Sequence, residues 1–487
     1  MDKQIQKALS IDADVCQGHG KCVMNCPTLF AIDASTGKAF VKTQPANAQL
    51  AQEAEMAMHD CPERAISLTT NESRQDSVSE ASRPCIDESM PQDIPRVDFD
   101  HNSREFAADP WRVYGELRAS CPIAHTDAHD GFWIVSKYAD VVEIAKDDAT
   151  FSSLPTTVIP DTGVYNLIPL QSDPPDLQRY RMPLIRYFTP AALKKYEPGI
   201  RQFTSDCIDT FIETGQCELV TQFANPIPSM TALDFIGFDP LEWHDFANPM
   251  HLLSYSADGS LEREQALADL VQIDSRIEDA IEARFVNPQA DAITELTQYE
   301  KDGVRFSSKE LHGLVKMLLF GGLDTTMAAA SNALLYLSEN PTQRQRLIDD
   351  PGLLPSAIDE FLRYEAPVHA FSRTVTTDVS IGDQKVRAGE RVYLLWASAN
   401  RDPDEFENPD EVVFDRRPNR HLTFGIGAHR CLGAPLARLE LKIMLEEILR
   451  RIPDFKIDAA KVKHPETVTV IWGRSTLPTS FTPGSRA

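Results

Sequence analysis

Residues 424–438 read FGIGAHRCLGAPLAR and place one cysteine, Cys431, in a segment with three glycines. Gly425, Gly427 and Gly433 permit tight turns and let the backbone approach a large flat ligand closely. A helix-forming run follows directly, so backbone N–H groups and the start of that helix can stabilise a negative sulfur. The pattern therefore indicates a thiolate that is presented to a metal.

This stretch resembles the haem-binding loop of the cytochrome P450 family. The resemblance implies that Cys431 is the axial ligand of haem b and that Phe424, Gly425 and Gly433 contact the cofactor. A single cysteine before a helix is more often a small buried hydrophobic residue. A match over fifteen consecutive residues disfavours that interpretation.

An E-x-x-R pair lies far upstream of the cysteine. Glu360 and Arg363 are spaced to share one face of a helix. In the family such a pair joins a downstream arginine, here Arg417, and braces the cysteine side of the haem. Taken alone, the pair would be a solvated pair on the surface of a helix. It supports the resemblance because it lies at the expected distance before Cys431.

Residues 318–326 read LLFGGLDTT and put an acid and alcohols inside an apolar helix. Buried polar groups cost free energy unless they are satisfied or functional. The resemblance implies that this helix crosses above the haem, with Gly321 and Gly322 leaving a groove for dioxygen. Asp324 and Thr325 match the positions that relay protons. A plain core helix would explain the glycines but not the acid.

Haem carries two propionates, which basic side chains must meet. Arg181, Arg373 and His429 occupy the family's anchoring positions. The chain departs from the family pattern at Leu177, where members commonly carry a histidine. We therefore expect one propionate to lack a donor.

The N-terminal region carries a different metal signature, Cys16-x2-His19-x2-Cys22-x3-Cys26-Pro, with a second Cys-Pro at Cys61. This matches the bacterial ferredoxin spacing with histidine in the second ligand position. In that spacing the cysteine of the first Cys-Pro serves the other cluster of two-cluster proteins. A second complete set is absent, so we expect one cluster held by Cys16, Cys22 and Cys61.

The sequence does not determine the ligand at the fourth corner of this cluster. It is either vacant, which gives [3Fe-4S], or closed by His19 or a small ligand, which gives [4Fe-4S]. Cys26 is then a spare thiol or a replacement ligand. A zinc site is the competing interpretation, because clustered His and Cys also suit tetrahedral zinc. Residues 61–66 are similar to single-cluster ferredoxins that feed bacterial monooxygenases, which favours iron and sulfur.

The length of 487 residues suits two unequal domains. We expect a small α+β ferredoxin-like domain over residues 1–70 and a mostly α cytochrome P450 fold with small β-sheets over residues 96–487. Residues 71–95 are poor in large apolar side chains and predict a flexible linker. Such a tether spans roughly 25 to 30 Å and gives an effective concentration on the order of millimolar.

Periodicity predicts helices over residues 311–337 and 436–451 and brief strands over residues 375–386 and 467–472. The first thirty residues do not resemble a signal peptide, and the longest apolar helix carries Asp324 near its middle. We therefore expect no membrane span. Nine cysteines without a disulfide framework suit the reducing cytoplasm.

The chain has 48 Lys and Arg against 73 Asp and Glu, a net charge of −25, which excludes nucleic acid as the default partner. No dinucleotide fingerprint is present, so the chain does not take hydride itself. The resemblance implies electrons from an NAD(P)H-dependent flavoprotein ferredoxin reductase, which pass through the cluster to the haem. There dioxygen is cleaved, and one oxygen atom enters a C–H bond of the substrate.

The substrate is expected to be small and hydrophobic. Residues 163–169, GVYNLIP, look like the segment by which bacterial camphor monooxygenase presents a tyrosine hydroxyl to its ketone substrate. Tyr165 would then be a substrate donor, although a buried tyrosine also commonly binds backbone. A small oxygenated terpenoid is favoured, and aromatic, fatty-acid and steroid substrates stay open.

A second hypothesis is a non-catalytic haem and iron–sulfur redox sensor, in which the N-terminal module reports the state of the cluster to a partner. Such a sensor would not need Asp324 and Thr325 over the haem. This difference favours the enzyme.

Overall fold

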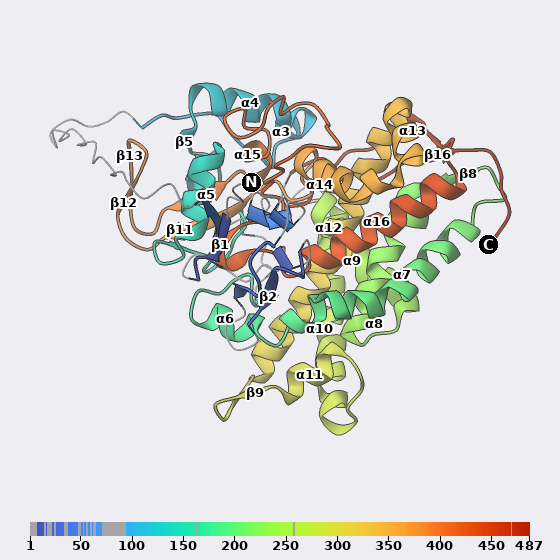
Figure 1. Ribbon diagram of the computed structural model, residues 1–487, viewed down its shortest axis with the longest axis horizontal. Helices are drawn as coiled ribbons and strands as arrows, with labels where there is room; N and C mark the ends of the chain where they lie inside the picture. The colour runs from blue at the N-terminus through green and yellow to red at the C-terminus, as the bar shows by residue number, and fades with distance from the viewer. Residues whose placement is uncertain are drawn as a thin grey trace, which may run out of the picture. The chain divides into compact units, whose positions relative to one another are not determined.

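The computed structural model describes residues 7–13, 16, 22–23, 26–33, 38–46, 50–51, 53–54, 57–58, 61, 65–70, 94–161, 164, 166–256, 259–468 and 470–487. The chain divides into two compact units, an N-terminal one that contains the residues up to Ile94 and a large one that contains most of the residues from Pro95 onward. Both are drawn in Figure 1. The predicted linker falls almost wholly outside the described residues, so the predicted domain limits stay a prediction.

The N-terminal unit is built on two short antiparallel ladders. Strand β1 (Lys7–Ile11) pairs with β4 (Ile66–Thr70), and β2 (Phe30–Ile32) pairs with β3 (Ala39–Val41). The ladder of β1 and β4 therefore joins the two ends of the unit. One small apolar cluster fills it: Leu9, Leu29, Phe30, Ala54, Ala57, Ala65 and Ile66, together with Cys16, Cys22 and Cys26. The predicted α+β class is confirmed.

The large unit contains one five-stranded sheet in the order β5-β6-β14-β11-β7. Strands β14 and β6 run parallel, and the other neighbours are antiparallel. The bounds are β5 (Ile123–Thr126), β6 (Phe132–Val135), β7 (Phe151–Ser152), β11 (Phe371–Val375) and β14 (Arg391–Leu394).

Smaller sheets complete the β-structure of the described residues. A three-stranded sheet has the order β15-β16-β8, and two hairpins pair β9 with β10 and β12 with β13. Their bounds are β8 (Gln216–Glu218), β9 (Glu300–Lys301), β10 (Val304–Arg305), β12 (Val379–Ile381), β13 (Gln384–Val386), β15 (Lys456–Ile457) and β16 (Pro478–Ser480).

Helices dominate the large unit, as Figure 1 shows. Their bounds are α3 (Arg104–Ala108), α4 (Pro110–Ser120), α5 (Tyr138–Lys146), α6 (Asp176–Arg181), α7 (Pro190–Asp209), α8 (Pro226–Ile236), α9 (Trp243–Tyr255), α10 (Leu261–Val286), α11 (Ala292–Gln298), α12 (Ser308–Glu339), α13 (Pro341–Asp349), α14 (Leu354–Tyr364), α15 (Trp396–Ala399) and α16 (Ala434–Arg451). The mostly helical fold with small sheets is the one predicted.

Helix α12 forms the centre of the large hydrophobic core. It begins with a capping box, in which the Ser307 hydroxyl accepts from the Glu310 backbone and the Glu310 carboxylate accepts from the Ser307 backbone. From Leu311 onward its residues are buried on most faces and pack with α8, α9, α14 and α16. The predicted helices over residues 311–337 and 436–451 are confirmed as α12 and α16.

The strand predicted over residues 467–472 is wrong. Among its described residues, Ile471 forms an isolated bridge with Val368, and Trp472 N–H donates to the Pro367 carbonyl. The chain then passes very close to its neighbours, because a Cβ on Gly473 would lie 2.6 Å from the Tyr255 hydroxyl. This close passage bends the segment away from a regular ladder.

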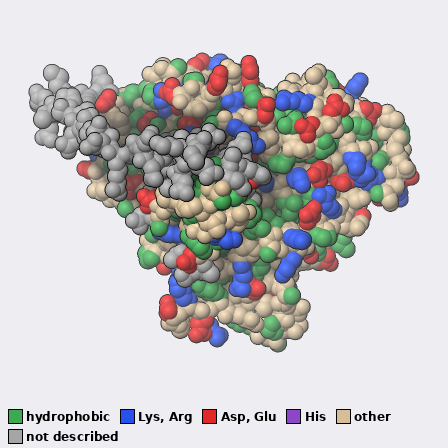
Figure 2. Space-filling model, viewed as in Figure 1, with side chains coloured by type: hydrophobic (Ala, Val, Ile, Leu, Met, Phe, Trp, Pro, Cys, Tyr) green, Lys and Arg blue, Asp and Glu red, His purple; other side chains and the backbone are tan. Residues whose placement is uncertain are grey.

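The surface mixes both signs of charge. Figure 2 shows acidic and basic side chains interspersed over the large unit on the viewed face, although the chain carries a net charge of −25. In the part of the chain that the structure describes, no helix has the length and apolar character needed to cross a membrane.

Candidate functional site

The loop that carries Cys431 is shaped by glycine. Gly425 and Gly427 adopt φ values of +66° and +72°, the left-handed region that costs other residues free energy. The Gly425 N–H donates to the Leu422 carbonyl, and the Cys431 N–H donates to the Phe424 carbonyl at 2.8 Å. The cysteine therefore sits at the end of a closed turn, three residues before α16 begins.

Backbone N–H groups at the start of α16 point at the sulfur of Cys431. The N–H groups of Gly433 and Ala434 hydrogen-bond to it and favour the thiolate, as does the charge of Arg181. Burial has the larger effect, and the pKa of the thiol is raised. The side chain is nevertheless exposed. The sulfur is thus accessible while protein surrounds it, as expected of a ligand presented to a cofactor inside a fold.

A hydrogen bond to α14 and a ring contact with Arg438 of α16 hold this loop, and Arg438 is itself bonded to α14. The Thr423 hydroxyl donates to the Leu362 carbonyl at 2.6 Å, and Arg438 Nε donates to Asp359 Oδ1 at 2.7 Å. The Arg438 guanidinium also lies 4.5 Å from the centre of the Phe424 ring. Phe424 is therefore held in place from the helix behind Cys431.

The three basic residues predicted to anchor propionates lie near one another. The charges of Arg373 and Arg181 both act on His429, whose pKa falls well below its usual value, chiefly through burial. His429 Nε2 lies 3.0 Å from the Ser153 hydroxyl. Arg181 donates to the Arg430 carbonyl at 2.7 Å. Segments far apart in the sequence, from α6, β11 and the cysteine loop, thus bring these groups together.

Arg181 and Arg373 form no ion pair with a carboxylate in the described part of the chain. Burial lowers the pKa of each to about 10, against the charges of Asp148 and Asp173 on Arg373 and of Cys431 on Arg181. The Arg373 guanidinium donates to the adjacent Ser372 carbonyl at 2.9 Å. Buried cations that form no ion pair are costly. Two such arginines beside an accessible thiol fit a flat cofactor with two carboxylates, so the donor set suits haem. Leu177, at the departure from the family pattern, is fully buried and offers no donor.

The residues predicted to line a dioxygen groove lie on one face of α12. Gly321 is exposed and Gly322 and Thr325 are half-buried, although the residues around them in this helix are mostly buried. The Thr325 hydroxyl donates to the Gly321 carbonyl at 2.9 Å. We call Gly321, Gly322 and Thr325 the accessible face of α12.

Asp324 points to a different side of the helix. It is 2 % exposed, and its Oδ1 lies 3.8 Å from Nδ1 of His251 on α9. Neither carboxylate oxygen of Asp324 has a hydrogen-bond partner among the described residues. Tyr255 stacks on His251, and the Asp324 charge is a secondary cause, after burial, of the raised pKa of Tyr255. The structure therefore separates the two groups of the predicted relay, with Thr325 on the accessible face and Asp324 behind it.

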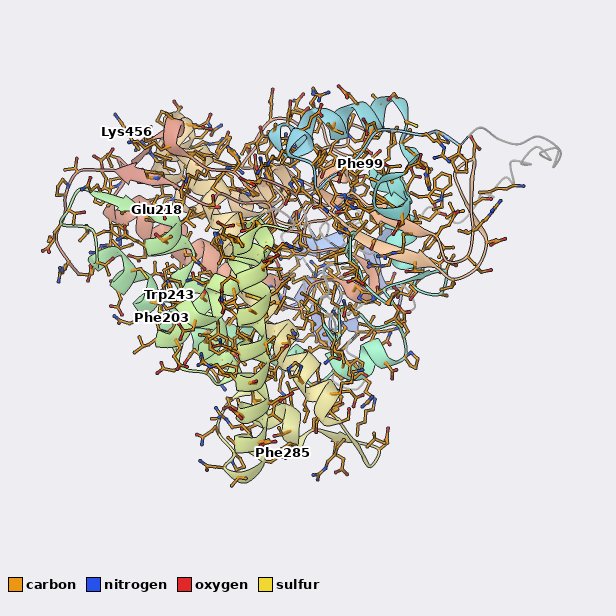
Figure 3. The ribbon with its side chains drawn as sticks, turned by 180° about the vertical axis from the view of Figure 1, so that it is seen from behind. Phe99, Phe203, Glu218, Trp243, Phe285 and Lys456 are labelled. Carbon is orange, nitrogen blue, oxygen red and sulfur yellow. The ribbon has the colours of Figure 1, made fainter. Side chains whose placement is uncertain are left out.

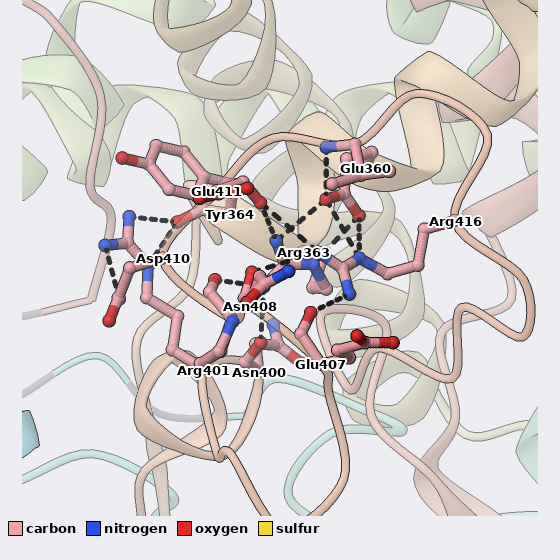
Figure 4. Close-up of polar contacts among 12 residues, drawn as sticks. Glu360, Arg363, Tyr364, Asn400, Arg401, Glu407, Asn408, Asp410, Glu411 and Arg416 are labelled. Carbon is pink, nitrogen blue, oxygen red and sulfur yellow. Dashed lines mark hydrogen bonds and ion pairs between the residues drawn. The ribbon is translucent and has the colours of Figure 1, made fainter.

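The E-x-x-R pair is buried and acquires a third member, as Figure 4 shows. Arg363 donates two hydrogen bonds to Glu360 at 2.8 Å, and both side chains are fully buried. Arg416 Nε donates to both oxygens of Glu360, at 3.0 and 3.1 Å. The prediction of Arg417 for this role is therefore wrong by one position. A turn explains the shift, because Val413 N–H donates to Glu360 and Arg416 N–H donates to the Val413 carbonyl.

The remaining donors of Arg363 reach the loop that precedes the cysteine segment. Its Nη1 donates to the carbonyls of Asn400 and Pro409, and its Nη2 donates to the carbonyl of Glu411. The pair thus fixes α14 against the loop over residues 400–416. Charge-assisted hydrogen bonds with planar geometry suit this bracing role.

Sequence reasoning missed Glu440 on α16. This acid is 4 % exposed, and burial raises its pKa to about 8, while hydrogen bonds from Thr326 and Thr231 lower it less. The sequence indicated this buried acid, because Leu436, Glu440 and Met444 follow one another at four-residue spacing on the buried side of α16. An acid on the apolar face of a predicted helix is a candidate buried carboxyl.

In the N-terminal unit the charges of two thiols, those of Cys16 and Cys61, act on the thiol of Cys22. Burial, with the charges of Cys61 and Cys16 as further causes, raises the pKa of the Cys22 thiol to about 12. Cys16 Sγ accepts from the Ala39 N–H at 3.3 Å. Cys26 instead donates to Glu53 Oε2 at 3.2 Å. Three neighbouring cysteines with a fourth engaged elsewhere fit an iron–sulfur cluster.

Two predicted site residues lie outside the described residues: His19, proposed near the cluster, and Tyr165, proposed as a substrate donor. Their neighbours Val164 and Asn166 are described. Val164 is part of the large core, and Asn166 Nδ2 donates to the Lys309 carbonyl at 2.9 Å. This bond ties the segment to the first turn of α12.

Comparison with known proteins identifies both units. Residues 262–477 match the model of the cytochrome P450 family, and residues 11–68 match the model of the 4Fe-4S single cluster domain of ferredoxin I. The second match favours an iron–sulfur cluster over the zinc alternative.

Relatives in sequence and structure agree for the large unit. The chain is 31% identical to cytochrome P450 130 of Mycobacterium tuberculosis over 382 residues, which cover 75% of this chain and 93% of that protein. The Bacillus subtilis polyketide synthase cytochrome P450 PksS superposes with a TM-score of 0.72 at 28% identity and covers 79% of this chain and 100% of its own. CYP109E1 from Bacillus megaterium, solved in complex with testosterone, superposes with a TM-score of 0.70 at 30% identity. The match covers 78% of this chain and 100% of that one.

Proposed function

The chain belongs to the cytochrome P450 family, and we propose that its N-terminal ferredoxin domain is the immediate electron donor of its own haem-thiolate monooxygenase domain. The observation that carries the proposal is the presence of both metal-binding units in one chain, the three neighbouring thiols and the Cys431 loop. An NAD(P)H-dependent flavoprotein ferredoxin reductase is the external partner. It supplies single electrons to the cluster held by Cys16, Cys22 and Cys61.

Haem bound beside Cys431 supplies the activation of dioxygen that lets one oxygen atom enter a C–H bond while the other leaves as water. The residues of the chain would hold and surround it. Cys431 would ligate the iron, and Arg181, Arg373 and His429 would receive the propionates. Phe424, Gly425 and Gly433 would shape the cysteine side.

Proton delivery is assigned to α12. Thr325 holds a hydroxyl on the accessible face, where its bond to the Gly321 carbonyl orients it. Asp324 is the buried acid behind it and faces His251. A proton that reaches Thr325 from Asp324 would need a rotation of the Asp324 side chain or a bridging water.

The substrate is a small hydrophobic molecule, and an oxygenated terpenoid is favoured. Tyr165 would donate a hydrogen bond to its oxygen. Gly321 and Gly322 would leave space for the substrate and dioxygen on the accessible face of α12. A steroid is the main competitor, because a structural neighbour is solved in complex with testosterone.

The cluster type and the compartment complete the proposal. With Cys26 bonded to Glu53, the fourth corner falls to His19, to a small ligand or to no ligand, which leaves [3Fe-4S] and [4Fe-4S] as the two forms. The free cysteines of the described residues support a location in the reducing cytoplasm. No observation favours the alternative of a non-catalytic sensor.

The electron route is tested with Cys22→Ser and a matched thiol variant of the large unit, Cys121→Ser. We expect Cys22→Ser to lose turnover driven by NADPH and a ferredoxin reductase, while dithionite still produces the ferrous carbonyl spectrum. Added separate ferredoxin should restore turnover. Cys121→Ser should behave as the wild type, since its thiol makes only a weak contact, 3.9 Å from the Ile123 carbonyl. Full turnover of Cys22→Ser with the reductase alone would disprove the route.

The substrate proposal is tested by spectral titration with a bicyclic monoterpene ketone, testosterone and a long-chain fatty acid. We expect the ketone to shift the haem spectrum at the lowest concentration, and Tyr165→Phe to weaken the ketone roughly 3- to 10-fold, as the loss of one hydrogen bond predicts. The matching hydrocarbon without the ketone should bind both proteins equally. A spectral shift at a lower concentration of testosterone than of the ketone would favour a steroid substrate over a terpenoid.

A further inference from the structure

A second group of metal-ligating side chains lies at the start of the large unit, apart from both sites described above. One ring nitrogen each of His101 and His129 and one carboxylate oxygen of Asp100 lie within 4.8 Å of one another. Asp100 and His101 precede α3, and His129 lies in the short turn Ala128–Asp130 between β5 and β6. Figure 3 labels Phe99, the residue before Asp100.

One ring nitrogen of His101 has no hydrogen-bond partner among the described residues. The residue is 1 % exposed, and its Nε2 hydrogen-bonds to the Ile159 carbonyl. A carbonyl can only accept, so Nε2 carries the proton and Nδ1 carries the lone pair. Nδ1 is buried and has no hydrogen-bond partner among the described residues. A histidine whose other nitrogen donates to a backbone carbonyl is the usual arrangement of a metal ligand.

The other two members are already close together. His129 Nε2 lies 2.8 Å from Asp100 Oδ1, and the rings of His101 and His129 are 5.7 Å apart in an edge-on arrangement. Two ligands of a tetrahedral zinc ion are separated by about 3.3 Å. The pair therefore needs only a small displacement to accept an ion in place of its shared proton.

We propose that Asp100, His101 and His129 form a binding site for a divalent first-row transition-metal ion, with Zn²⁺ as the reference ion. Two neutral imidazoles and one carboxylate are ligands that Zn²⁺ accepts, and they leave a fourth position for water. Asp100 and His129 are partly exposed, which gives the ion a path of entry. A hydrogen bond between Asp100 and His129 alone would not satisfy the buried lone pair on Nδ1 of His101.

The ion would stabilise one particular part of the fold. It would join the first residues of the large unit to the turn between β5 and β6 and, through His101, to the backbone at Ile159. Because binding favours the folded state, saturating Zn²⁺ raises the melting temperature of the large unit. The site is distinct in chemistry from the cysteines of the N-terminal unit, since it contains no sulfur.

The test uses the full-length holoprotein in metal-free buffer, titrated with Zn²⁺. The variants are His129→Asn and Asp100→Asn, with His244→Ala as the control for loss of an exposed histidine. Asparagine suits position 129, because His129 has a left-handed backbone with φ +51°, which asparagine tolerates well. Asparagine at position 100 keeps the shape of the side chain and removes its charge.

We expect the wild type and His244→Ala to bind one more equivalent of Zn²⁺ than His129→Asn. Asp100→Asn should bind that equivalent roughly 10- to 100-fold more weakly. Zinc X-ray absorption of the wild type should show nitrogen and oxygen ligands at this equivalent. Equal stoichiometry and affinity in all four proteins, or sulfur ligands at this equivalent, would overturn the proposal. Before the titration, an unchanged ferrous carbonyl spectrum shows that each variant is folded. If His129→Asn does not fold, the affinity of Asp100→Asn for Zn²⁺ tests the proposal.

Discussion

The two metal-binding regions of this chain use cysteine in different ways. In the large unit one thiol, Cys431, is presented by a glycine turn that α14 and α16 hold in place through Thr423 and Arg438. In the N-terminal unit the thiols are themselves part of the small apolar core, as Cys16, Cys22 and Cys26 show. The first region is a scaffold that offers a ligand. In the second, two of the proposed ligands, Cys16 and Cys22, are themselves part of the core that packs the fold.

This difference predicts that metal and folding are coupled in the N-terminal unit and much less in the large one. Small units bury little apolar surface, so a bound metal supplies a larger fraction of their stability. Large helical units with an extensive core keep their fold when one ligand is changed. The following experiments test this contrast, beginning with the largest expected effect.

Cys22→Ser is expected to unfold the N-terminal unit, because it changes a buried core side chain that is also a proposed cluster ligand. Limited proteolysis should then cut within residues 1–70 while the large unit stays intact. Cys121→Ser is the control in the large unit. A protease-resistant N-terminal unit without a cluster would show that its core suffices, and the contrast would be lost.

Cys431→Ser is expected to abolish the red-shifted ferrous carbonyl band, since a thiolate axial ligand produces it. The helical circular dichroism should change little, because the loop is held by contacts that do not involve the sulfur. Persistence of the band would show that Cys431 is not the axial ligand. Loss of the helical signal would show that this unit also depends on its metal.

Glu360→Gln is expected to destabilise the large unit by about 3 to 5 kcal/mol, because it leaves the buried charges of Arg363 and Arg416 without their carboxylate. The measurement is the denaturant midpoint of the holoprotein. Glu300→Gln provides the control, since its ion pair with Arg305 is exposed and worth about 0 to 1 kcal/mol. Equal midpoints for both variants would show that the buried carboxylate of Glu360 does not stabilise the large unit.

Thr325→Ala is expected to leave reductant consumption in place while diverting oxygen to peroxide, because the hydroxyl on the accessible face of α12 is lost. Roughly 10²-fold less product per reductant is the expected size for loss of one proton-transfer group. Peroxide and product are measured together. Thr325→Ser, which keeps the hydroxyl, should stay coupled, and full coupling in the alanine variant would exclude the role.

Glu440→Gln is expected to reduce the dependence of stability on pH. Because the pKa of Glu440 is raised from 4.5 to about 8, the folded protein binds a proton that the unfolded chain releases. This stabilisation is complete below pH 4.5 and is lost as the pH rises to about 8. The slope between these values is up to about 1.4 kcal/mol per pH unit, and Gln should remove it. Midpoints at pH 5, 6, 7 and 8 that change equally in both proteins would contradict this.

Motif spacing was sufficient to predict much of this molecule. The FGIGAHRCLG segment and the Cys16–Cys22 spacing indicated two metal-binding units, because metal ligands need particular residues at particular separations. The long periodic helices α12 and α16 were also predictable, since their apolar residues recur along one or more faces. The strand over residues 467–472 failed because contacts with distant backbone replaced the ladder.

Relations between distant or adjacent residues could be seen only in three dimensions. Asp324 and Thr325 are neighbours in sequence, but successive residues of a helix point about 100° apart, so one faces His251 and the other the accessible face. Arg416 takes the place expected for Arg417 because a turn at Val413 directs it back to Glu360.

The sequence by itself therefore determined which residues are candidate metal ligands, because ligand chemistry requires particular residue types at short, fixed separations. Their environment came from packing. Arg181, Arg373 and His429 come from three distant segments. Only the assembled fold brings them close together, and neither arginine forms an ion pair with a carboxylate among the described residues. Burial, unlike residue type, is a property of everything that surrounds a side chain, so it emerges when the whole chain has folded.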